Sequence, residues 1–576
     1  MAATDPKITA LRKLLAQHKI DAFVVPSADE FQGEYVPAAA RRLEFLTGFT
    51  GSNGLAVIHR TKAAFFTDGR YTLQAQTQVP AVYGKHNLAD MPAARWVKEK
   101  LPPKTMVGFD PKLFTLRQLE QWEKLGLKLK PVPNLIDAIW KDRPAYPADA
   151  AFDYPQKFAG ESRAAKIKRV CAKLQADALL VAAPDSLCWL LNIRGNDIPH
   201  TPFLNAVALL AKNGEVTLFT DPAKIPEKLR GKMKIAPPAQ PLSIKLKGKR
   251  ILCDSAQASV WWAERLKKAG AEIVSGIDPI QLMKARKNDT EIKGIRSAHV
   301  RDGAALSSFL CWLDRAWQGG RLTEVNAAEV LATFRAKQMH FRDLSFGTIA
   351  GMGSNGAIVH YHAMPETAKK LTHGIFLLDS GGQYWDGTTD VTRTIALGAP
   401  TKQQQADFTR VLKGHIALAR ARFPKGVTGS ELDALARMPL WLEGKDYDHG
   451  TGHGVGCYLS VHEGPQRISR VMNNVPLESG MVVSNEPGYY KTGAYGIRIE
   501  NLVLVKEDRR KGDERPFFGF ETLTLAPIDR HLVAKALLTK EERDWLDDYH
   551  ARVLKTLTPL VDKTTGAWLK KMCTKI

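Results

Sequence analysis

The sequence predicts a chain of α/β domains followed by an α+β domain. Its 576 residues are enough for about two to four domains of ordinary size. In the first half, helix-like and apolar strand-like runs occur twice in the same order. After residue 288 the pattern of a long amphipathic helix begins, and helical stretches then alternate with β-like runs. These observations indicate α/β architecture in the first half and α+β architecture in the second.

The first half repeats one unit of helices and strands. The first copy contains LRKLLAQHKI, DAFVVPSADEF, LEFLTGF and LAVIHRTKAAFFTDGRY, and the second contains IKRVCAKLQA, DALLVAAPDSL, CWLLNIRG and AVALLAKNGEVTLFTDPAK. The order of elements agrees, and so do the closing sequences FFTD and LFTD. This duplication predicts two α/β domains with mostly buried strands. The proline-rich residues 142–155 are typical of a linker between them.

The second half begins with a long helix. We expect Asp289 or Thr290 to cap it, before IKGIRSAHVRDGAALSSFLCWLDRAW. Near the end of the chain, Thr539 and Glu542 predict a capping box at the start of an amphipathic helix that packs on the third domain. The predicted domains are residues 1–150, 151–288, 289–516 and 517–576.

Composition limits the classes of function. Apolar residues make up 44% of the chain, and no apolar run approaches the ~20 residues of a membrane span. The net charge is +22, but the basic residues are dispersed and not interleaved with aromatic residues, so we expect a solvated surface and no nucleic-acid partner. The N-terminal MAATDPKITALRKLL lacks the apolar region of a secretory signal, and six scattered cysteines without a CxxC pair indicate a reducing cytoplasm.

Residues 449–465, HGTGHGVGCYLSVHEGP, place three histidines among closely spaced glycines. A helical zinc motif through His449 and His453 is disfavoured, because glycine costs about 1 kcal/mol relative to alanine in a helix interior. The motif's glutamate after the first histidine is also missing. We expect a loop or irregular strand whose backbone approaches another group closely. Taken alone, the segment also fits a surface loop with incidental histidines.

Two aspartates flank a glycine-rich turn in FLLDSGGQYWDGTTDVTRT. Asp379 ends one apolar run and Asp390 begins the next, and a hairpin would bring them face to face. Two aspartates in contact repel each other unless positive charge lies between them. Asp386 lies in the turn itself, where we expect it to bond its own backbone.

Further carboxylates follow apolar strands downstream. Glu486 ends the run MVVSNE before a Pro-Gly turn, and a period of two places Arg498 and Glu500 on one face of YGIRIEN. Any one of these charges fits an edge or surface position. Together, two aspartates, two glutamates and a histidine are ligands suited to a pair of divalent ions, whose formal charge four carboxylates would balance.

The motifs DSGGQYWDGTTDVTRT, HGTGHGVGCYLSVHEGP, SNEPGYY and GIRIEN, in this order, resemble the Xaa-Pro aminopeptidase (aminopeptidase P) branch of the pita-bread metallopeptidases in its three-domain form. The resemblance covers nearly the whole chain, including the duplicated N-terminal part and the FETLTLAPID tail. It implies two creatinase-like α/β domains, a C-terminal pita-bread catalytic domain and a homodimer. The implied reaction releases the N-terminal residue from short peptides with proline in second position.

The resemblance also implies a role for each metal ligand. Asp379 would bind one metal ion, Asp390 and Glu500 would bridge both ions, and His453 and Glu486 would complete the other. No ligand position departs from the family pattern. The family metal is commonly Mn²⁺, with Zn²⁺ or Co²⁺ as alternatives, and the hardness of the ligands agrees with manganese.

The remaining roles are catalytic or concern substrate binding. By resemblance, Glu486 takes the proton of the attacking water and passes it toward the leaving group. His360 and His462 match positions that contact the substrate carbonyl and backbone, and His449 matches one that lines the proline pocket. Arg498 would orient a carboxylate or a substrate group, and a structural ion pair is an equal alternative.

Alternatives remain within the fold and outside it. A prolidase or a methionine aminopeptidase would share the fold, but the three domains and HGTGHGVGCYLSVHEGP argue against both. A non-catalytic binding module could use the positive charge to hold acidic partners. Such modules typically lose metal ligands, and this sequence keeps all five positions.

Overall fold

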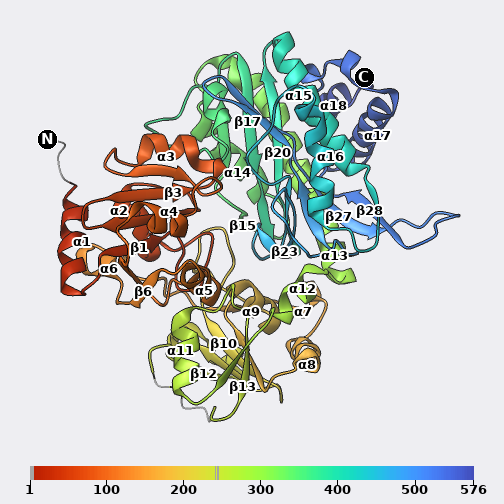
Figure 1. Cartoon of the computed structure of the whole chain (residues 1–576). Coiled ribbons are helices and arrows are strands. Elements are labelled where there is room, and N and C mark those ends of the chain that lie inside the picture. The colour runs from red at the N-terminus through yellow and green to blue at the C-terminus, as the bar shows by residue number, and fades with distance from the viewer. Residues whose placement is uncertain (1–4, 241, 243–245) are drawn as a thin grey trace. The chain divides into compact units, whose positions relative to one another are not determined.

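A computed structural model describes residues 5–240, 242 and 246–576. These residues form two compact units, coloured red to yellow-green and green to blue in Figure 1. The first unit extends to Tyr154 and continues over Glu161–Ile280, and the second comprises Pro155–Gly160 and Gln281–Ile576. None of the helices in these described ranges is long and apolar enough to cross a membrane.

The first half of unit 1 is a mixed sheet with helices, in the strand order β4-β3-β2-β1-β5-β6. β1 pairs antiparallel with β2 and parallel with β5, and it is buried at every position, as expected for a strand covered on both faces. The elements are α1 (Pro6–Gln17), β1 (Ala22–Pro26), α2 (Arg42–Thr47), β2 (Gly54–His59), β3 (Ala63–Thr67), α3 (Thr72–Gln78), β4 (Gly84–Asn87), α4 (Ala93–Lys100), β5 (Met106–Phe109), α5 (Leu116–Lys124), β6 (Lys128–Pro131) and α6 (Leu135–Ile139).

The second half of unit 1 repeats this topology, in the order β12-β11-β10-β8-β13-β14. β8 pairs antiparallel with β10 and parallel with β13, as β1 does with β2 and β5. The duplication predicted from the sequence is therefore confirmed. Its elements are β7 (Phe152–Asp153), α8 (Arg163–Lys173), β8 (Ala178–Val181), α9 (Pro184–Leu191), β9 (Ile193–Arg194), β10 (Val207–Ala211), β11 (Val216–Phe219), α10 (Glu227–Arg230), β12 (Lys234–Ala236), β13 (Arg250–Cys253), α11 (Val260–Lys268), β14 (Glu272–Ser275) and the connecting α12 (Pro279–Ala285).

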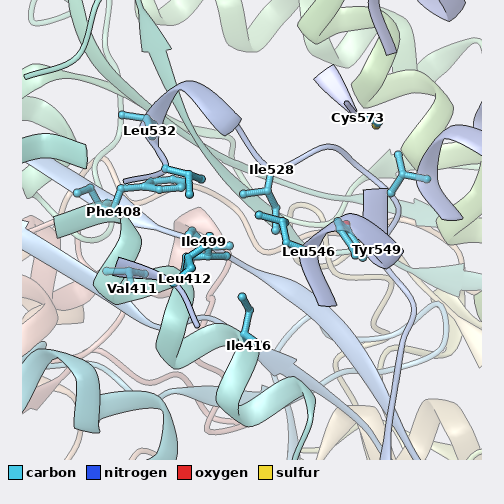
Figure 2. Close-up of a cluster of buried hydrophobic side chains, with 14 of the residues drawn as sticks. Phe408, Val411, Leu412, Ile416, Ile499, Ile528, Leu532, Leu546, Tyr549 and Cys573 are labelled. Carbon is cyan, nitrogen blue, oxygen red and sulfur yellow. The ribbon is translucent and has the colours of Figure 1, made fainter. Parts of the chain in front are cut away.

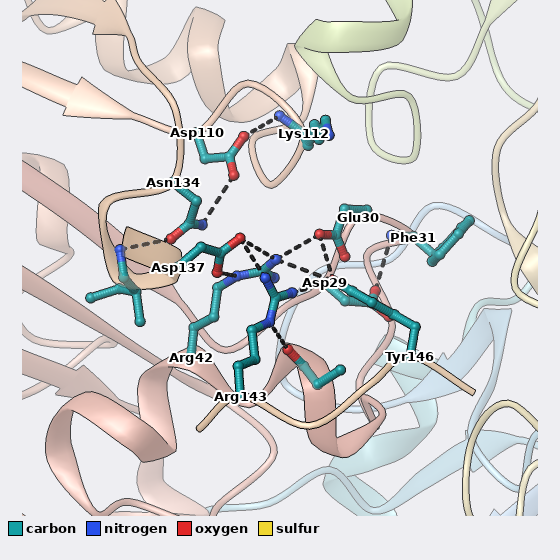
Figure 3. A network of polar contacts seen from close by, with 12 residues as sticks. Asp29, Glu30, Phe31, Arg42, Asp110, Lys112, Asn134, Asp137, Arg143 and Tyr146 are labelled. Carbon is teal, nitrogen blue, oxygen red and sulfur yellow. Dashed lines mark hydrogen bonds and ion pairs between the residues drawn. The ribbon is translucent and has the colours of Figure 1, made fainter. Parts of the chain in front are cut away.

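The duplication extends to a buried aspartate after the equivalent strands β5 and β13. Asp110 accepts a backbone hydrogen bond from Lys112 at 2.9 Å, and Asp254 accepts one from Ala256 at the same distance. Figure 3 shows Asp110 beside Asn134. Each aspartate thereby fixes the turn that leads from its strand to the next helix.

The residue near this aspartate that begins the next helix but one differs between the two copies: it is Asn134 in the first and Asp278 in the second. Asn134 donates its side-chain amide to Asp110 at 3.0 Å, and its oxygen accepts the amide of Ile136 at the start of α6. In the second copy Asp278 takes this place and accepts the amide of Ile280 at 2.9 Å at the start of α12. The second copy thus buries a carboxyl where the first has an amide.

The long segment after β1 is held by a buried arginine, also drawn in Figure 3. Arg42 is 2% exposed and donates to Glu30 at 2.8 Å and to Asp137 at 2.7 Å. The hydroxyl of Tyr146 donates to Glu30 at 2.9 Å and accepts from Arg143 at 2.6 Å. This network ties the loop after β1 to α2 and α6.

The long helix predicted for the second half is present in unit 2 as α13 (Asp289–Ala316), but the predicted cap is wrong. Asn288 is the N-cap, because its side chain accepts from the amide of Glu291 and Glu291 returns a bond to the Asn288 amide. This capping box satisfies donors at both positions. The capping box predicted at Thr539 and Glu542 is present at the start of α17 (Lys540–Leu557).

The strands of unit 2 form several sheets, among them β16-β17-β20 and β21-β28-β27-β24-β22-β23. The strands are β15 (Phe341–Leu344), β16 (Ile349–Met352), β17 (Gly374–Ser380), β18 (Gly382–Tyr384), β19 (Gly387–Thr388), β20 (Val391–Leu397), β21 (Arg422–Pro424), β22 (Gly452–Gly454), β23 (Glu463–Ile468), β24 (Val482–Asn485), β25 (Gly488–Lys491), β26 (Tyr495–Arg498), β27 (Asn501–Glu507) and β28 (Phe517–Thr522). The remaining helices are α7 (Gln156–Ala159), α14 (Glu324–Ala336), α15 (Lys402–Ala419), α16 (Gly429–Trp441), α17 (Lys540–Leu557) and α18 (Lys563–Met572).

A large hydrophobic cluster joins the C-terminal helices to the rest of unit 2. Figure 2 shows Phe408 and Leu412 of α15 near Ile499, which follows β26, and Leu546 of α17 belongs to the same buried cluster. The terminal element thus packs on the preceding domain, as predicted. Ile499 also anchors the strand end from which Glu500 projects, because its side chain is 1% exposed in this core.

The glycines of the histidine-rich segment are needed for close approach, as predicted, but to neighbouring backbone. A Cβ on Gly452 would lie 2.0 Å from the carbonyl oxygen of Ser484, and one on Gly454 would lie 2.1 Å from that of Glu463. These glycines therefore let β22 pair closely with β23 and β24.

Candidate active site

Two paired strands place the first pair of candidate carboxylates. In β17 and β20, Asp379 is the register partner of Thr392, and Asp390 immediately precedes β20. Glu500 follows β26, and its amide donates to the Thr392 carbonyl at 3.2 Å while the Thr392 hydroxyl donates to its carboxylate at 2.8 Å. The paired strands β17 and β20 carry Asp379 and Thr392, and Thr392 binds Glu500 at the end of β26. Carboxylates from distant parts of the sequence thus lie close together.

Asp390, His453 and Glu500 each offer a ligand atom, and these atoms lie within 4.8 Å of one another. The Nε2 atom of His453 lies 3.5 Å from Asp390 and 3.5 Å from Glu486. The Nδ1 atom of His453 donates to the carbonyl of Gly454 at 3.0 Å, so Nε2 is the ring nitrogen that faces the carboxylates. This arrangement suits a metal-binding imidazole.

Asp379 completes the cluster of predicted ligands. Its Oδ2 accepts from Arg498 at 2.6 Å, whereas its buried Oδ1 has no hydrogen-bond partner among the described residues. A buried carboxylate oxygen without a donor is costly unless a cation binds it. Arg498 is 2% exposed and forms a buried ion pair with Asp379, whereas its role in orienting a carboxylate or a substrate group stays a prediction.

The electrostatics of the cluster favour cations. Burial raises the pKa of Asp379 to about 6, against the effect of Arg498, and burial together with neighbouring carboxylates raises the pKa values of Glu486 and Glu500. Burial opposes the charged form of His453, yet Asp390 and Glu486 raise its pKa to about 9. Burial and mutual repulsion thus disfavour the ionised forms of Asp379, Glu486 and Glu500, and bound cations would offset this cost, so the donor set fits divalent cations.

A hydrogen-bonded chain leads from Asp379 to His449. Arg498 donates to the hydroxyl of Tyr490 at 2.6 Å, and this hydroxyl lies 2.8 Å from Nε2 of His449. Nδ1 of His449 must donate to the carbonyl of Gly450, so Nε2 accepts the Tyr490 proton. Sequence reasoning missed Tyr490, although it lies inside the SNEPGYY motif.

His462 and His360 approach the site from separate segments. The rings of His462 and His453 lie 4.3 Å apart, centroid to centroid, at 71°. His360 follows Val359, whose carbonyl accepts from Arg498 at 3.4 Å, so its segment lies beside that arginine. His462 therefore lies beside a candidate ligand, whereas the segment of His360 is placed beside Arg498 through its backbone.

The loop that carries His462 is anchored by the next residue. Glu463 is buried and lies 2.6 Å from the Nζ of Lys287 and 3.1 Å from that of Lys284, and the lysine side chains are 1% exposed. A buried ion pair of this kind fixes geometry more than it adds stability. It holds the end of the histidine-rich segment against the α12–α13 connection.

Asp386 lies in the turn between β18 and β19, as predicted, but its carboxylate forms an ion pair with Arg301 of α13. The prediction that it bonds its own backbone was wrong, because α13 packs against β19, where Gly387 lies beside Ala298 and Ile295. That contact places a basic side chain within reach of the turn.

Family models match nearly the whole chain. Metallopeptidase family M24 matches residues 293–507, and the C-terminal region of that family matches 516–576. The creatinase/prolidase N-terminal domain matches twice, at 7–139 and 142–291. The predicted fold class, two creatinase-like domains followed by a pita-bread domain, is confirmed, whereas the boundaries at 150, 288 and 516 stay predictions.

The fold and the carboxylate–histidine cluster define a metallopeptidase, and the chain belongs to family M24. Within it, the chain belongs to the aminopeptidase P group. A probable Xaa-Pro aminopeptidase P of Laccaria bicolor is 40% identical over 100% of this chain and 94% of its own length, and aminopeptidase P1 of Arabidopsis thaliana is 38% identical over 98% of each.

Solved structures agree with this assignment. An X-prolyl aminopeptidase from Caenorhabditis elegans, described as a cytosolic enzyme with a di-nuclear active site, is 34% identical, with a TM-score of 0.93 over 99% of both chains. An Xaa-Pro dipeptidase from Bacillus anthracis is 25% identical, with a TM-score of 0.51, and covers only 64% of this chain and 98% of its own. The chain therefore matches the longer aminopeptidase architecture over its full length.

Proposed function

We propose that this protein is a metallo-aminopeptidase that hydrolyses the first peptide bond of substrates with proline in second position. The observation that carries the proposal is the buried cluster of Asp390, His453 and Glu500, with Asp379 and Glu486 beside it, in an M24 fold. The full-length similarity to Xaa-Pro aminopeptidases supports the substrate class.

Two divalent ions would be held by the proposed ligands Asp379, Asp390, His453, Glu486 and Glu500. When bound, such ions polarise the scissile carbonyl and lower the pKa of water near neutrality. Four carboxylates balance two divalent cations, and the di-nuclear site of the C. elegans enzyme supports the number. We propose Mn²⁺, with Zn²⁺ or Co²⁺ as alternatives, because hard oxygen ligands predominate.

Glu486 is the proposed proton carrier. Its burial raises the pKa of its carboxyl, so it can hold a proton between steps, and Ser484 donates to its Oε1 at 3.2 Å. A leaving proline nitrogen belongs to a tertiary amide and carries no hydrogen, so a proton must reach it as the bond breaks. Glu486 lies 3.5 Å from His453, beside the other proposed metal ligands, and this position supports the proposed role.

The histidines are the proposed substrate contacts. The ring of His449 lies 4.7 Å from that of Tyr447 and 5.4 Å from that of Tyr490, centroid to centroid. Aromatic walls of this kind suit a proline ring, and the hydrogen bond from Tyr490 fixes the imidazole. We propose that His360 and His462 contact the substrate backbone and that Arg498 acts through Asp379 and Tyr490.

Hydrolysis of Arg-Pro-Pro and of Gly-Pro by the purified protein, with its metal content, tests this function. We expect release of arginine from Arg-Pro-Pro and about two divalent ions per chain after Mn²⁺ loading. Cleavage of dipeptides alone would favour a prolidase. A protein that binds no divalent ion after loading would instead favour a non-catalytic scaffold.

We propose a cytoplasmic homodimer acting on short peptides. The description of the C. elegans enzyme as cytosolic supports the compartment. Exposed apolar side chains at the end of α16 support self-association: Met438, Trp441 and Leu442 are 52%, 44% and 80% exposed and share one helix face.

Leu442→Glu is expected to convert such a dimer into monomers, because the carboxylate would have to be desolvated at the contact. Light scattering after size exclusion would measure the mass. The matched control is Leu560→Glu, which alters a leucine that is 54% exposed on another element of unit 2. A variant that keeps twice the chain mass would rule this face out as the contact.

A further inference from the structure

The buried carboxylate of Glu324 accepts hydrogen bonds from several residues of the segment that carries His360. Glu324 is the first residue of α14 and is 0% exposed. Its amide donates to the carbonyl of Lys369 at 3.0 Å, and the amide of Lys369 donates back to its carboxylate at 2.8 Å. Its carboxylate also accepts from the Met352 amide at 2.6 Å, the Asn355 side chain at 3.0 Å and the Tyr361 hydroxyl at 3.0 Å.

These donors bracket His360 on both sides. Met352 and Lys369 mark the two ends of the segment, and Tyr361 directly follows His360. Tyr361 is 8% exposed, so its hydroxyl has little access to water if the bond to Glu324 is lost. A single carboxylate thus fixes the segment at its ends and next to the histidine.

The chemistry of the contact requires a carboxylate. An ionised carboxylate offers about four acceptor sites, and the groups that face Glu324 are all donors. Among the described residues, no lysine or arginine side chain forms an ion pair with it, so its charge is stabilised by neutral donors. Glutamine would turn one acceptor into a donor and set it against another donor.

We propose that Glu324 is a positioning residue that places His360 for the reaction. The segment already reaches the site, because the carbonyl of Val359 accepts from Arg498 at 3.4 Å. Glu324 holds the backbone of this segment at Met352 and Lys369, and it holds the side chain of Tyr361. These contacts restrict where His360 can lie relative to that arginine. This inference rests on the proposed substrate contact of His360.

Glu324→Gln is expected to lower kcat/KM for Arg-Pro-Pro by about 10- to 100-fold, since a displacement of about 1 Å can cost about 10²-fold. The loss is expected in kcat, with KM and bound metal unchanged. Glu329→Gln is the matched control, because Glu329 is an exposed glutamate on the same helix. Tyr361→Phe removes the hydroxyl and with it the bonds to Glu324, Asn355 and Thr367. It leaves the other donors to Glu324 in place, and is expected to cause a smaller loss.

A double-mutant cycle separates positioning from general stability. In a His360→Ala background, Glu324→Gln is expected to change kcat/KM by less than about twofold, because the residue it positions is gone. Equal losses in both backgrounds would overturn the proposal. If Glu324→Gln does not fold, Tyr361→Phe is measured in both backgrounds instead. Equal losses in the two backgrounds would again overturn the proposal.

The rate of trypsin cleavage at Lys369 and Lys370 measures how firmly the segment is anchored, and this measurement does not depend on the proposed peptidase activity. If the wild-type protein hydrolyses no proline peptide, the proposed function fails, and the anchoring of the segment is still measured. Glu324→Gln is expected to be cut at least about tenfold faster than wild type and Glu329→Gln at the wild-type rate, because cleavage follows local opening. Equal rates for both variants would refute anchoring by Glu324.

Discussion

Asp390→Ala is expected to lower kcat/KM by about 10³-fold or more while the chain stays folded. Asp390 contacts His453 and belongs to the cluster with Glu500, so its loss removes the proposed bridge between two cations. Bound cations contribute several kcal/mol to such reactions, and each ~1.4 kcal/mol is a factor of about ten in rate.

The same substitution is expected to stabilise the metal-free protein or leave it unchanged. Asp390 is one of the charges that raise the pKa of Glu500, after burial itself, so its removal relieves repulsion in the folded state. Elemental analysis, circular dichroism and thermal unfolding in chelator would be compared with those of Asp544→Ala, an exposed aspartate on α17. Wild-type turnover in Asp390→Ala would refute the bridging role.

The parts of the site that are local in sequence could be predicted. Asp379 and Asp390 flank one turn, and strand periodicity placed Arg498 and Glu500 together, so their positions followed from patterns of two to twelve residues. The duplicated domains followed in the same way, because the order of apolar runs repeats. The assignment of metal ligands itself came from the family resemblance and stays a proposal.

Other features depend on contacts that no local pattern encodes. Tyr361 and Glu324 are 37 residues apart, and Arg498 and Asp379 are 119 apart, so neither pair is visible in the sequence. The cap of α13 was misplaced because Asn288, like the two residues after it, is a good capping residue, and only the backbone geometry selects it.

Asp278→Asn is expected to stabilise unit 1 at pH 8 and to have little effect at pH 4. Burial, together with the neighbouring carboxylates Asp185 and Asp254, raises the pKa of Asp278 from 3.8 to about 7. The folded chain therefore holds this proton more tightly than the unfolded chain, and wild-type stability falls as the pH rises from about 4 to about 7. About three pKa units correspond to at most about 4 kcal/mol.

The substitution should fit, because the duplicated domain already has asparagine there. The Asn134 oxygen accepts the helix amide of Ile136 at 3.0 Å, as Asp278 accepts that of Ile280, and its amide group donates to Asp110. In the second copy the backbone amide of Asp278 already donates to Asp254 at 3.1 Å. The variant would keep that bond and would place an uncharged amide where a buried carboxyl now lies near Asp185 and Asp254.

Hydrogen exchange of β13 and β14 at several pH values would measure the opening free energy around this site without assuming that the whole chain unfolds in two states. The gain from Asp278→Asn is expected to grow between pH 4 and pH 7 and then to level off. The reciprocal variant, Asn134→Asp, buries a second carboxyl beside Asp110 and is expected to weaken β5 and β6 increasingly over the same pH range. A gain of equal size at pH 4 and pH 8 would show that titration of Asp278 is not its cause.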